Sequence, residues 1–145
     1  MLTFHTEIEI AATADRVWSI LMDFPGYGRW NPFIRSLEGT ARVGATLKAF
    51  IQPPGGRGMQ FQPTVLAVEA AREFRWKGKL WVPGLFDGEH FFLLATGPHG
   101  RVLFRQGEIF SGLLVPLMKK SLESDTKAGF VAMNEALKRR SESPE

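Results

Sequence analysis

A change of hydrophobic period near residue 112 constrains the fold of this chain more than any other feature of its sequence. Between Arg35 and Gly112, apolar and polar residues alternate with a period close to two, which is typical of strands with one buried face. From Pro116 to about Arg140, apolar or small residues recur with a helical period instead. The chain is therefore predicted to end in one long helix that follows a run of strands.

Turn-forming segments divide the alternating region into six predicted strands. These segments are rich in glycine, proline or polar residues, and such residues reverse the chain between antiparallel neighbours. The predicted turns are GTARVG, QPPGGRG, VEAARE, VPGLFDG and TGPHG. An alternating segment at the N-terminus, TFHTEIEI, adds a seventh strand.

Two short helices are predicted between the first strand and the other six. Thr13 can cap a helix with the sequence ADRVWSILMDF, and Pro25 ends it because the residue before a proline is disfavoured in the helical conformation. The next segment, DFPGYGRWNPFI, places Tyr27, Trp30 and Phe33 at intervals of three residues. That spacing puts the three aromatic rings on one side of a second, tight helical turn.

The composition indicates a single domain without cysteine chemistry. A chain of 145 residues suits one core, and 44% hydrophobic with 23% charged residues is ordinary for a globular protein. The absence of cysteine excludes disulfides, thiolate nucleophiles and cysteine-ligated metals. The three histidines have no metal-ligand spacing, so no metal site and no cofactor is predicted.

The charge pattern favours neither a nucleic acid nor a membrane as a partner. The net charge is +3, and the basic residues between 72 and 79 alternate with apolar ones as on the wet face of a strand. No apolar run approaches the roughly 20 residues of a membrane helix, and no charged leader precedes an apolar segment. A cytoplasmic location without a transmembrane segment is the default expectation, and the sequence leaves the oligomeric state open.

The order of the predicted elements, together with three segments, resembles the SRPBCC or START-like superfamily, which includes pollen allergens, in its polyketide-cyclase-like branch. The segments are IEIAATADRVWSILMDFPGYGRWNPFI, GEHFFLL and RQGEIFSGLLVPLM, and the resemblance covers nearly the whole chain. It implies an α+β helix-grip fold: a curved, seven-stranded antiparallel sheet wraps around the long C-terminal helix and leaves an apolar cavity. We expect one such ligand-binding domain over residues 1–140 and a disordered polar tail at 141–145.

Alternation along the strands predicts an aromatic inner face of the sheet. Because Arg75, Lys77 and Arg105 must face water, the positions between them must face the C-terminal helix. The aromatic residues assigned to this inner face are Phe61, Phe74, Trp76, Phe92, Phe104 and Phe110.

Three polar residues share the inner face by the same alternation, namely His90, Gln106 and Glu108. A buried carboxylate is costly unless it is paired, so His90 and Glu108 are predicted to form a pair. Such a pair could anchor a mostly apolar ligand or act on it as an acid/base couple. It could equally be a satisfied structural network, or lie where the inner face meets water.

Four further positions complete the predicted site. Trp30 and Phe33 are expected to cap one end of the enclosure, with Trp30 reaching toward the ligand or simply filling the core. Gly129 and Met133 face the sheet from the C-terminal helix, where the glycine either leaves room for a ligand or lets the helix approach closely. The complete predicted ligand site comprises Trp30, Phe33, Phe61, Trp76, His90, Phe92, Phe104, Gln106, Glu108, Phe110, Gly129 and Met133.

Two classes of function fit these residues. The first is a binding module that encloses a small hydrophobic or amphipathic molecule such as a lipid, a polyketide or an aromatic metabolite. The second is a cofactor-independent cyclase, dehydratase or hydrolase with Glu108 as base and His90 as acid. A co-chaperone-like or toxin–antitoxin accessory role is implied only by the diversity of the family. One candidate acid/base pair without a recognisable oxyanion donor favours binding.

Overall fold

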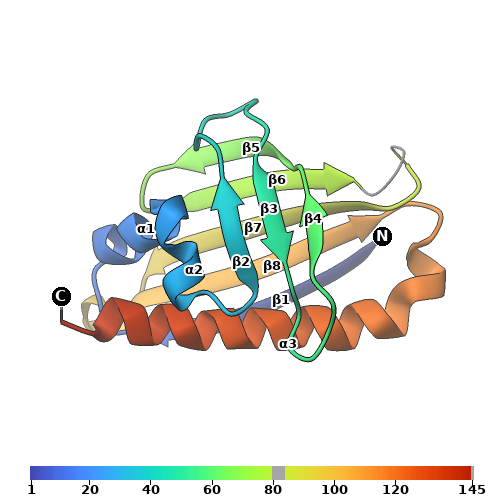
Figure 1. The fold of residues 1–145 in the computed structure, drawn as a ribbon. Coiled ribbons are helices and arrows are strands. Elements are labelled where there is room, and N and C mark those ends of the chain that lie inside the picture. Colours follow the sequence, from blue (N-terminus) through green and yellow to red (C-terminus); the bar gives the residue numbers. More distant parts are fainter. Residues whose placement is uncertain (80–83, 145) are drawn as a thin grey trace.

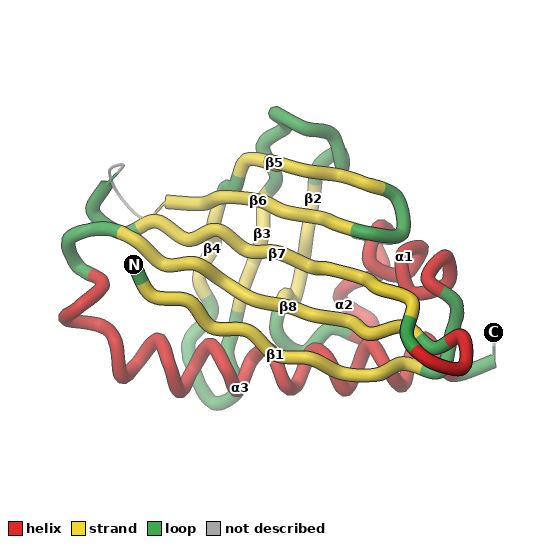
Figure 2. The backbone as a smooth tube through the Cα atoms, turned by 180° about the vertical axis from the view of Figure 1, so that it is seen from behind, coloured by secondary structure: helices red, strands yellow, loops and turns green. Residues whose placement is uncertain are grey.

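Eight strands form two antiparallel sheets in the computed structural model, which describes residues 1–79 and 84–144. The five-stranded sheet has the order β1 (Leu2–Ile10), β8 (Val102–Ser111), β7 (Asp87–Thr96), β6 (Glu73–Lys79) and β5 (Thr64–Glu69). The three-stranded sheet consists of β2 (Ile34–Glu38), β3 (Lys48–Ile51) and β4 (Met59–Phe61). The strands of the smaller sheet cross in front of the larger sheet in Figure 1 and behind it in Figure 2.

The short helices α1 (Ala14–Met22) and α2 (Tyr27–Trp30) lie at one end of the sheets, and the long helix α3 (Val115–Glu142) runs along one side (Figure 1). The chain also forms the single turns η1 (Phe24–Gly26) and η2 (Pro98–Gly100). The predicted cap of α1 is confirmed, because the Thr13 hydroxyl accepts a hydrogen bond from the Arg16 backbone N–H at 3.1 Å. α3 runs alongside β1 below both sheets (Figure 1). None of the helices in the described part of the chain combines the length and apolar character of a membrane span.

The predicted seven-stranded sheet is wrong in its strand count and in its continuity. The alternating pattern predicts one strand between the turns QPPGGRG and VEAARE, whereas the structure has two, β4 and β5. Pro63 stands between them and has no backbone N–H for a strand ladder. An isolated bridge between Thr46 and Thr64 joins the two sheets at one corner. The α+β class, the antiparallel strands and the long C-terminal helix are confirmed.

α3 extends beyond its predicted end near Arg140. Ser141 is buried, and Ser141 and Glu142 form the last turn of the helix rather than the start of a polar tail. The guanidinium of Arg16 donates hydrogen bonds of 3.2 to 3.4 Å to the carbonyls of Arg140, Ser141 and Ser143, which stabilises this turn. Residue 145 of the predicted tail and residues 82–83 of the predicted turn VPGLFDG lie outside the described residues.

The aromatic inner face lies between the two sheets. Phe74, Phe92 and Phe104 are fully buried and stack in sequence, with ring centroids 6.0 and 6.1 Å apart. On the opposite face, the Arg75 guanidinium pairs at 2.8 Å with the carboxylates of both Glu73 and Glu89. The alternation read from the sequence therefore gives the correct strand register.

Tyr27 closes one end of the core. Its side chain is fully buried, and its hydroxyl donates a hydrogen bond of 2.7 Å to the Leu21 carbonyl, which ties α2 to the last turn of α1. Its ring packs edge-on against Phe24 and Trp30. Burial, and to a smaller extent the charge of Asp23, raises the pKa of the Tyr27 phenol well above its ordinary value.

Replacing Tyr27 by phenylalanine should lower the free energy of unfolding at neutral pH by about 1 kcal/mol, because one buried hydrogen bond is lost. The same change should make the protein less sensitive to alkali. The phenol of an unfolded tyrosine ionises at about pH 10, while the buried phenol stays protonated. The free energy of unfolding of the wild type therefore falls as the pH rises above about 10. The Tyr27→Phe variant lacks this loss.

Denaturant melts of both proteins at neutral and alkaline pH measure this difference. Because Tyr27 is the only tyrosine in the chain, tyrosinate absorbance reports on this ring alone. Ionisation of the folded wild type at the pH of a free tyrosine would contradict the prediction.

Candidate functional site

A cavity of about 290 Å³ lies between the two sheets and the N-terminal half of α3. Its wall on the five-stranded sheet consists of Trp76, Gly78, Lys79, Gly88, Glu108 and Phe110. The hairpin of β3 and β4 contributes Ile51, Met59 and Phe61, and α3 contributes Met118 and Leu122. Of the charged residues in the lining, Arg57, Lys79 and Asp125 are exposed, whereas Glu108 is half-buried. The lining is therefore mostly apolar, and among the described residues Glu108 is its one sequestered charge-bearing group.

Two glycines make room beside Glu108. Gly78 on β6 and Gly88 on β7 are directly paired across the strands, so this part of the inner face carries no side chains. A Cβ atom on Gly88 would overlap Oε2 of Glu108. A glycine at position 88 is therefore needed for the carboxylate to occupy its place in the cavity wall.

His90 and Glu108 form the pair that the sequence predicts. The two residues are directly opposite each other on β7 and β8, and His90 Nδ1 lies 2.7 Å from Glu108 Oε1. The His90 side chain is buried, whereas that of Glu108 is 16% exposed. The ring of His90 is packed against Trp76, Phe92 and Phe130, with centroids 4.6 to 5.3 Å away. The pair thus connects the cavity to the aromatic core.

The pair continues into a hydrogen-bond network, which is one of the alternatives that the sequence leaves open, and two members of this network were not predicted. His90 Nε2 lies 2.9 Å from Gln106 Oε1, and Gln106 Nε2 donates to Asn134 Oδ1 at 2.8 Å. Asn134 Nδ2 in turn donates to Thr6 Oγ1 at 2.7 Å. Asn134 and Thr6 are the missed residues. A polar side chain beside Met133 on the buried face of α3 is the signal that could have identified Asn134.

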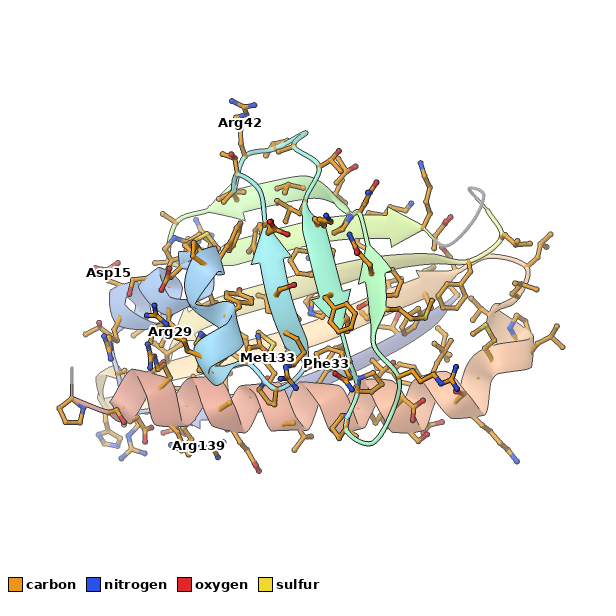
Figure 3. All side chains as sticks on the ribbon, in the orientation of Figure 1. Asp15, Arg29, Phe33, Arg42, Met133 and Arg139 are labelled. Atoms are coloured by element: carbon orange, nitrogen blue, oxygen red, sulfur yellow. The ribbon has the colours of Figure 1, made fainter. Side chains whose placement is uncertain are left out.

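Five of the predicted site residues line the cavity, namely Phe33, Phe61, Trp76, Glu108 and Phe110. Six others are buried behind this lining, namely His90, Phe92, Phe104, Gln106, Gly129 and Met133. Trp30 does not reach toward the cavity and instead lines a separate surface depression with Arg29, Ala136, Arg139, Arg140 and Ser143. In Figure 3, Phe33 and Met133 point into the interior beside α3, whereas Arg139 points away from it.

Gly129 serves close packing rather than the cavity. It is buried on α3, it is absent from the cavity lining, and a Cβ atom built on it would overlap the ring of Phe33. The Phe33 ring also makes an edge-on contact with Phe130, with centroids 5.8 Å apart. The missing side chain therefore lets Phe33 pack directly on the helix backbone, and Phe33 in turn forms part of the cavity wall.

Replacing Gly129 by leucine should overpack this contact and lower the free energy of unfolding by about 1–3 kcal/mol. The matched control is Ala128→Leu, which adds similar bulk at the preceding, exposed position of α3 and should stay within about 0.5 kcal/mol of the wild type. Thermal or urea unfolding of the three proteins measures the difference. A Gly129→Leu variant that melts above the wild type would show that the position borders empty space.

The whole architecture matches a known family. Residues 1–142 match the family model described as polyketide cyclase / dehydrase and lipid transport. The chain belongs to this family. The SRPBCC and START-like resemblance seen in the sequence is thereby confirmed. Membership in the polyketide cyclase / dehydrase and lipid transport family fits either a ligand-binding or a cyclase role.

Solved structures agree with the family assignment at the level of the fold. A START superfamily protein from Mycobacterium smegmatis is 23% identical, with a TM-score of 0.73 and 97% of each chain covered. Protein MLL2253 from Mesorhizobium loti is 22% identical, with a TM-score of 0.72 and 96% of each chain covered. The di-domain ARO/CYC StfQ of the steffimycin biosynthetic pathway is 14% identical with a TM-score of 0.74, and the match covers 97% of this chain and 50% of StfQ. No curated protein matches the chain.

The chemistry available at this site is that of a carboxyl–imidazole pair in an apolar surrounding. Among residues 1–79 and 84–144, no group of three or more histidine, aspartate or glutamate side chains is arranged to hold a metal ion. The pair can orient a ligand through a hydrogen bond, or exchange a proton with it.

Proposed function

We propose that this protein binds one small apolar or amphipathic molecule in the cavity between its sheets and carries or sequesters it. The observation that supports the proposal is a mostly apolar cavity of about 290 Å³ in which Glu108 is the one sequestered charge-bearing group among the described lining residues. Small-molecule sites typically measure about 300–1,000 Å³ and combine an apolar lining with a few polar groups that fix orientation. The family description, which includes lipid transport, is consistent with this role.

The role of the cavity can be tested directly by a substitution on β6 that fills it, Gly78→Leu. Gly78 has ordinary backbone geometry, and a Cβ atom there would make only van der Waals contacts with Pro63, at 3.7 and 3.9 Å. The remainder of a leucine side chain at this position would project into the cavity. The matched control is Lys77→Leu, which places the same side chain one residue earlier, on the opposite and exposed face of β6.

Titration with N-phenylnaphthylamine, a neutral dye that fluoresces in apolar surroundings, should show one-to-one binding to the wild type and a melting temperature that rises with dye concentration. Gly78→Leu should weaken binding at least tenfold while the protein remains folded by circular dichroism. Lys77→Leu should bind like the wild type. Equal binding by the two variants, or no binding by the wild type, would contradict the proposed function.

A second candidate function is a cofactor-independent reaction that uses the same pair. The specific observation in its favour is the hydrogen bond of 2.7 Å between His90 Nδ1 and Glu108 Oε1 at the cavity wall. In this case Glu108 would accept a proton from a bound substrate, and His90, which lies behind Glu108, would supply a proton to the substrate through Glu108, as in a cyclase, dehydratase or hydrolase. The fold is shared with StfQ, an ARO/CYC protein of a biosynthetic pathway.

The Glu108→Gln variant separates the two candidates, because glutamine keeps the shape and hydrogen-bonding capacity of glutamate without its proton exchange. A carrier should release its bound molecule unchanged from both proteins. An enzyme should convert the molecule only when Glu108 is present, with binding retained in the variant. Mass spectrometry of molecules recovered from the wild type and the variant after incubation with a cell extract reads both outcomes.

A further inference from the structure

The polarity of the network behind Glu108, that is, which partner donates in each hydrogen bond, is set by the contact between Thr6 and a main-chain carbonyl at the far end. The main-chain carbonyl of Gln106 can only accept, so the Thr6 hydroxyl donates its single hydrogen to that oxygen, at 3.4 Å. Thr6 Oγ1 must then accept from Asn134 Nδ2, at 2.7 Å. This leaves Asn134 Oδ1 to accept from Gln106 Nε2, at 2.8 Å.

The same polarity continues to His90. Because Gln106 donates to Asn134 through Nε2, it presents its carbonyl oxygen Oε1 to His90 Nε2, at 2.9 Å. A carbonyl oxygen has no hydrogen, so Nε2 of His90 carries the proton of this bond. His90 Nδ1 and Glu108 Oε1, which are 2.7 Å apart, therefore share one further proton between them.

The second carboxylate oxygen of Glu108, Oε2, faces the cavity and is free to accept a hydrogen bond from a ligand. Oε2 lies against Gly88, which also lines the cavity, and among the described residues it has no hydrogen-bond partner. The shared proton can sit on Nδ1 or on Oε1, and Oε2 is an acceptor in both states. A proton on Oε2 would instead set two bare lone pairs, on Nδ1 and Oε1, against each other.

We infer that the cavity selects apolar molecules that present a hydrogen-bond donor, a hydroxyl or an N–H group, to Glu108. It disfavours molecules that present a carboxylate at this point, because two acceptors would meet without a hydrogen between them. Gln106, Asn134 and Thr6 are positioning residues in this account, since they fix which atom of His90 carries the proton. The inference rests on the proposed binding function and adds the class of molecule bound.

Three probes that share one ring system test the selection in the wild type, namely naphthol, methoxynaphthalene and naphthoate substituted at the same ring position. Quenching of tryptophan fluorescence gives the dissociation constant of each. Naphthol should bind about tenfold more tightly than methoxynaphthalene, which is the typical effect of one buried hydrogen bond. Naphthoate should bind more weakly than both.

Two variants at Glu108 show whether the preference arises there. In Glu108→Gln, His90 Nδ1 accepts from the new amide N–H and the amide oxygen faces the cavity, so the preference for naphthol should persist. In Glu108→Leu the preference should vanish, while methoxynaphthalene still binds. Loss of the preference in Glu108→Gln would overturn the assigned polarity.

The ¹⁵N NMR spectrum of the His90 ring tests the polarity without any ligand. The wild type should show a protonated Nε2. In Asn134→Leu, the Gln106 amide can turn and donate to Nε2, so Nε2 should release its proton to solvent and the shared proton should be found on Nδ1. A bare Nε2 in the wild type would overturn the inference, and this holds even if the Asn134 variant does not fold.

The probe measurements separate failure of this inference from failure of the proposed function. Equal binding of naphthol and methoxynaphthalene to the wild type, or tightest binding of naphthoate, would overturn the selection while leaving the binding function in place. Absence of binding for all three probes would contradict both.

Discussion

The hydrogen bond between His90 and Glu108 at the cavity wall is the interaction on which the rest of this structure depends. A polar pair among aromatic rings is costly unless every donor and acceptor is satisfied, and here both ring nitrogens of His90 have partners at 2.7 and 2.9 Å. The two partners of His90, Glu108 and Gln106, lie on β8, and Gln106 in turn donates a hydrogen bond to Asn134 on α3. The network therefore ties the long helix to the sheet through directional hydrogen bonds, in a core that is mostly apolar.

The cavity beside this pair follows from the residues that surround it. Gly78 and Gly88 face each other across β6 and β7, which removes two side chains from the inner face next to Glu108. Further along α3, the Phe33 ring packs against Gly129 and occupies the place of its missing side chain. A pair of strand glycines thus leaves a void and a helix glycine closes one, although glycine supplies no side chain in either case.

Residue patterns predicted the inner face well and the details of the site less well. Alternation of charged and apolar residues sufficed to place His90 and Glu108 together, because strand register fixes which side chains share a face. It could not find Asn134, since one asparagine in a long helix has no periodic signature until its buried neighbours are known. The break between β4 and β5 has a cause that the sequence shows, namely Pro63. The sequence shows no cause for the position of Trp30 outside the cavity, because a three-residue spacing defines a helix face but not what that face packs against.

The most direct test of an apolar binding cavity uses the methionine methyl groups as internal probes. Met59 and Met118 line the cavity, whereas Met22 and Met133 lie elsewhere in the packed structure. In methyl NMR of protein labelled at methionine, titration with methoxynaphthalene should shift the signals of Met59 and Met118 with saturation at one equivalent, and leave those of Met22 and Met133 in place. Unchanged signals for Met59 and Met118, or shifts that begin at Met22 or Met133, would contradict this account.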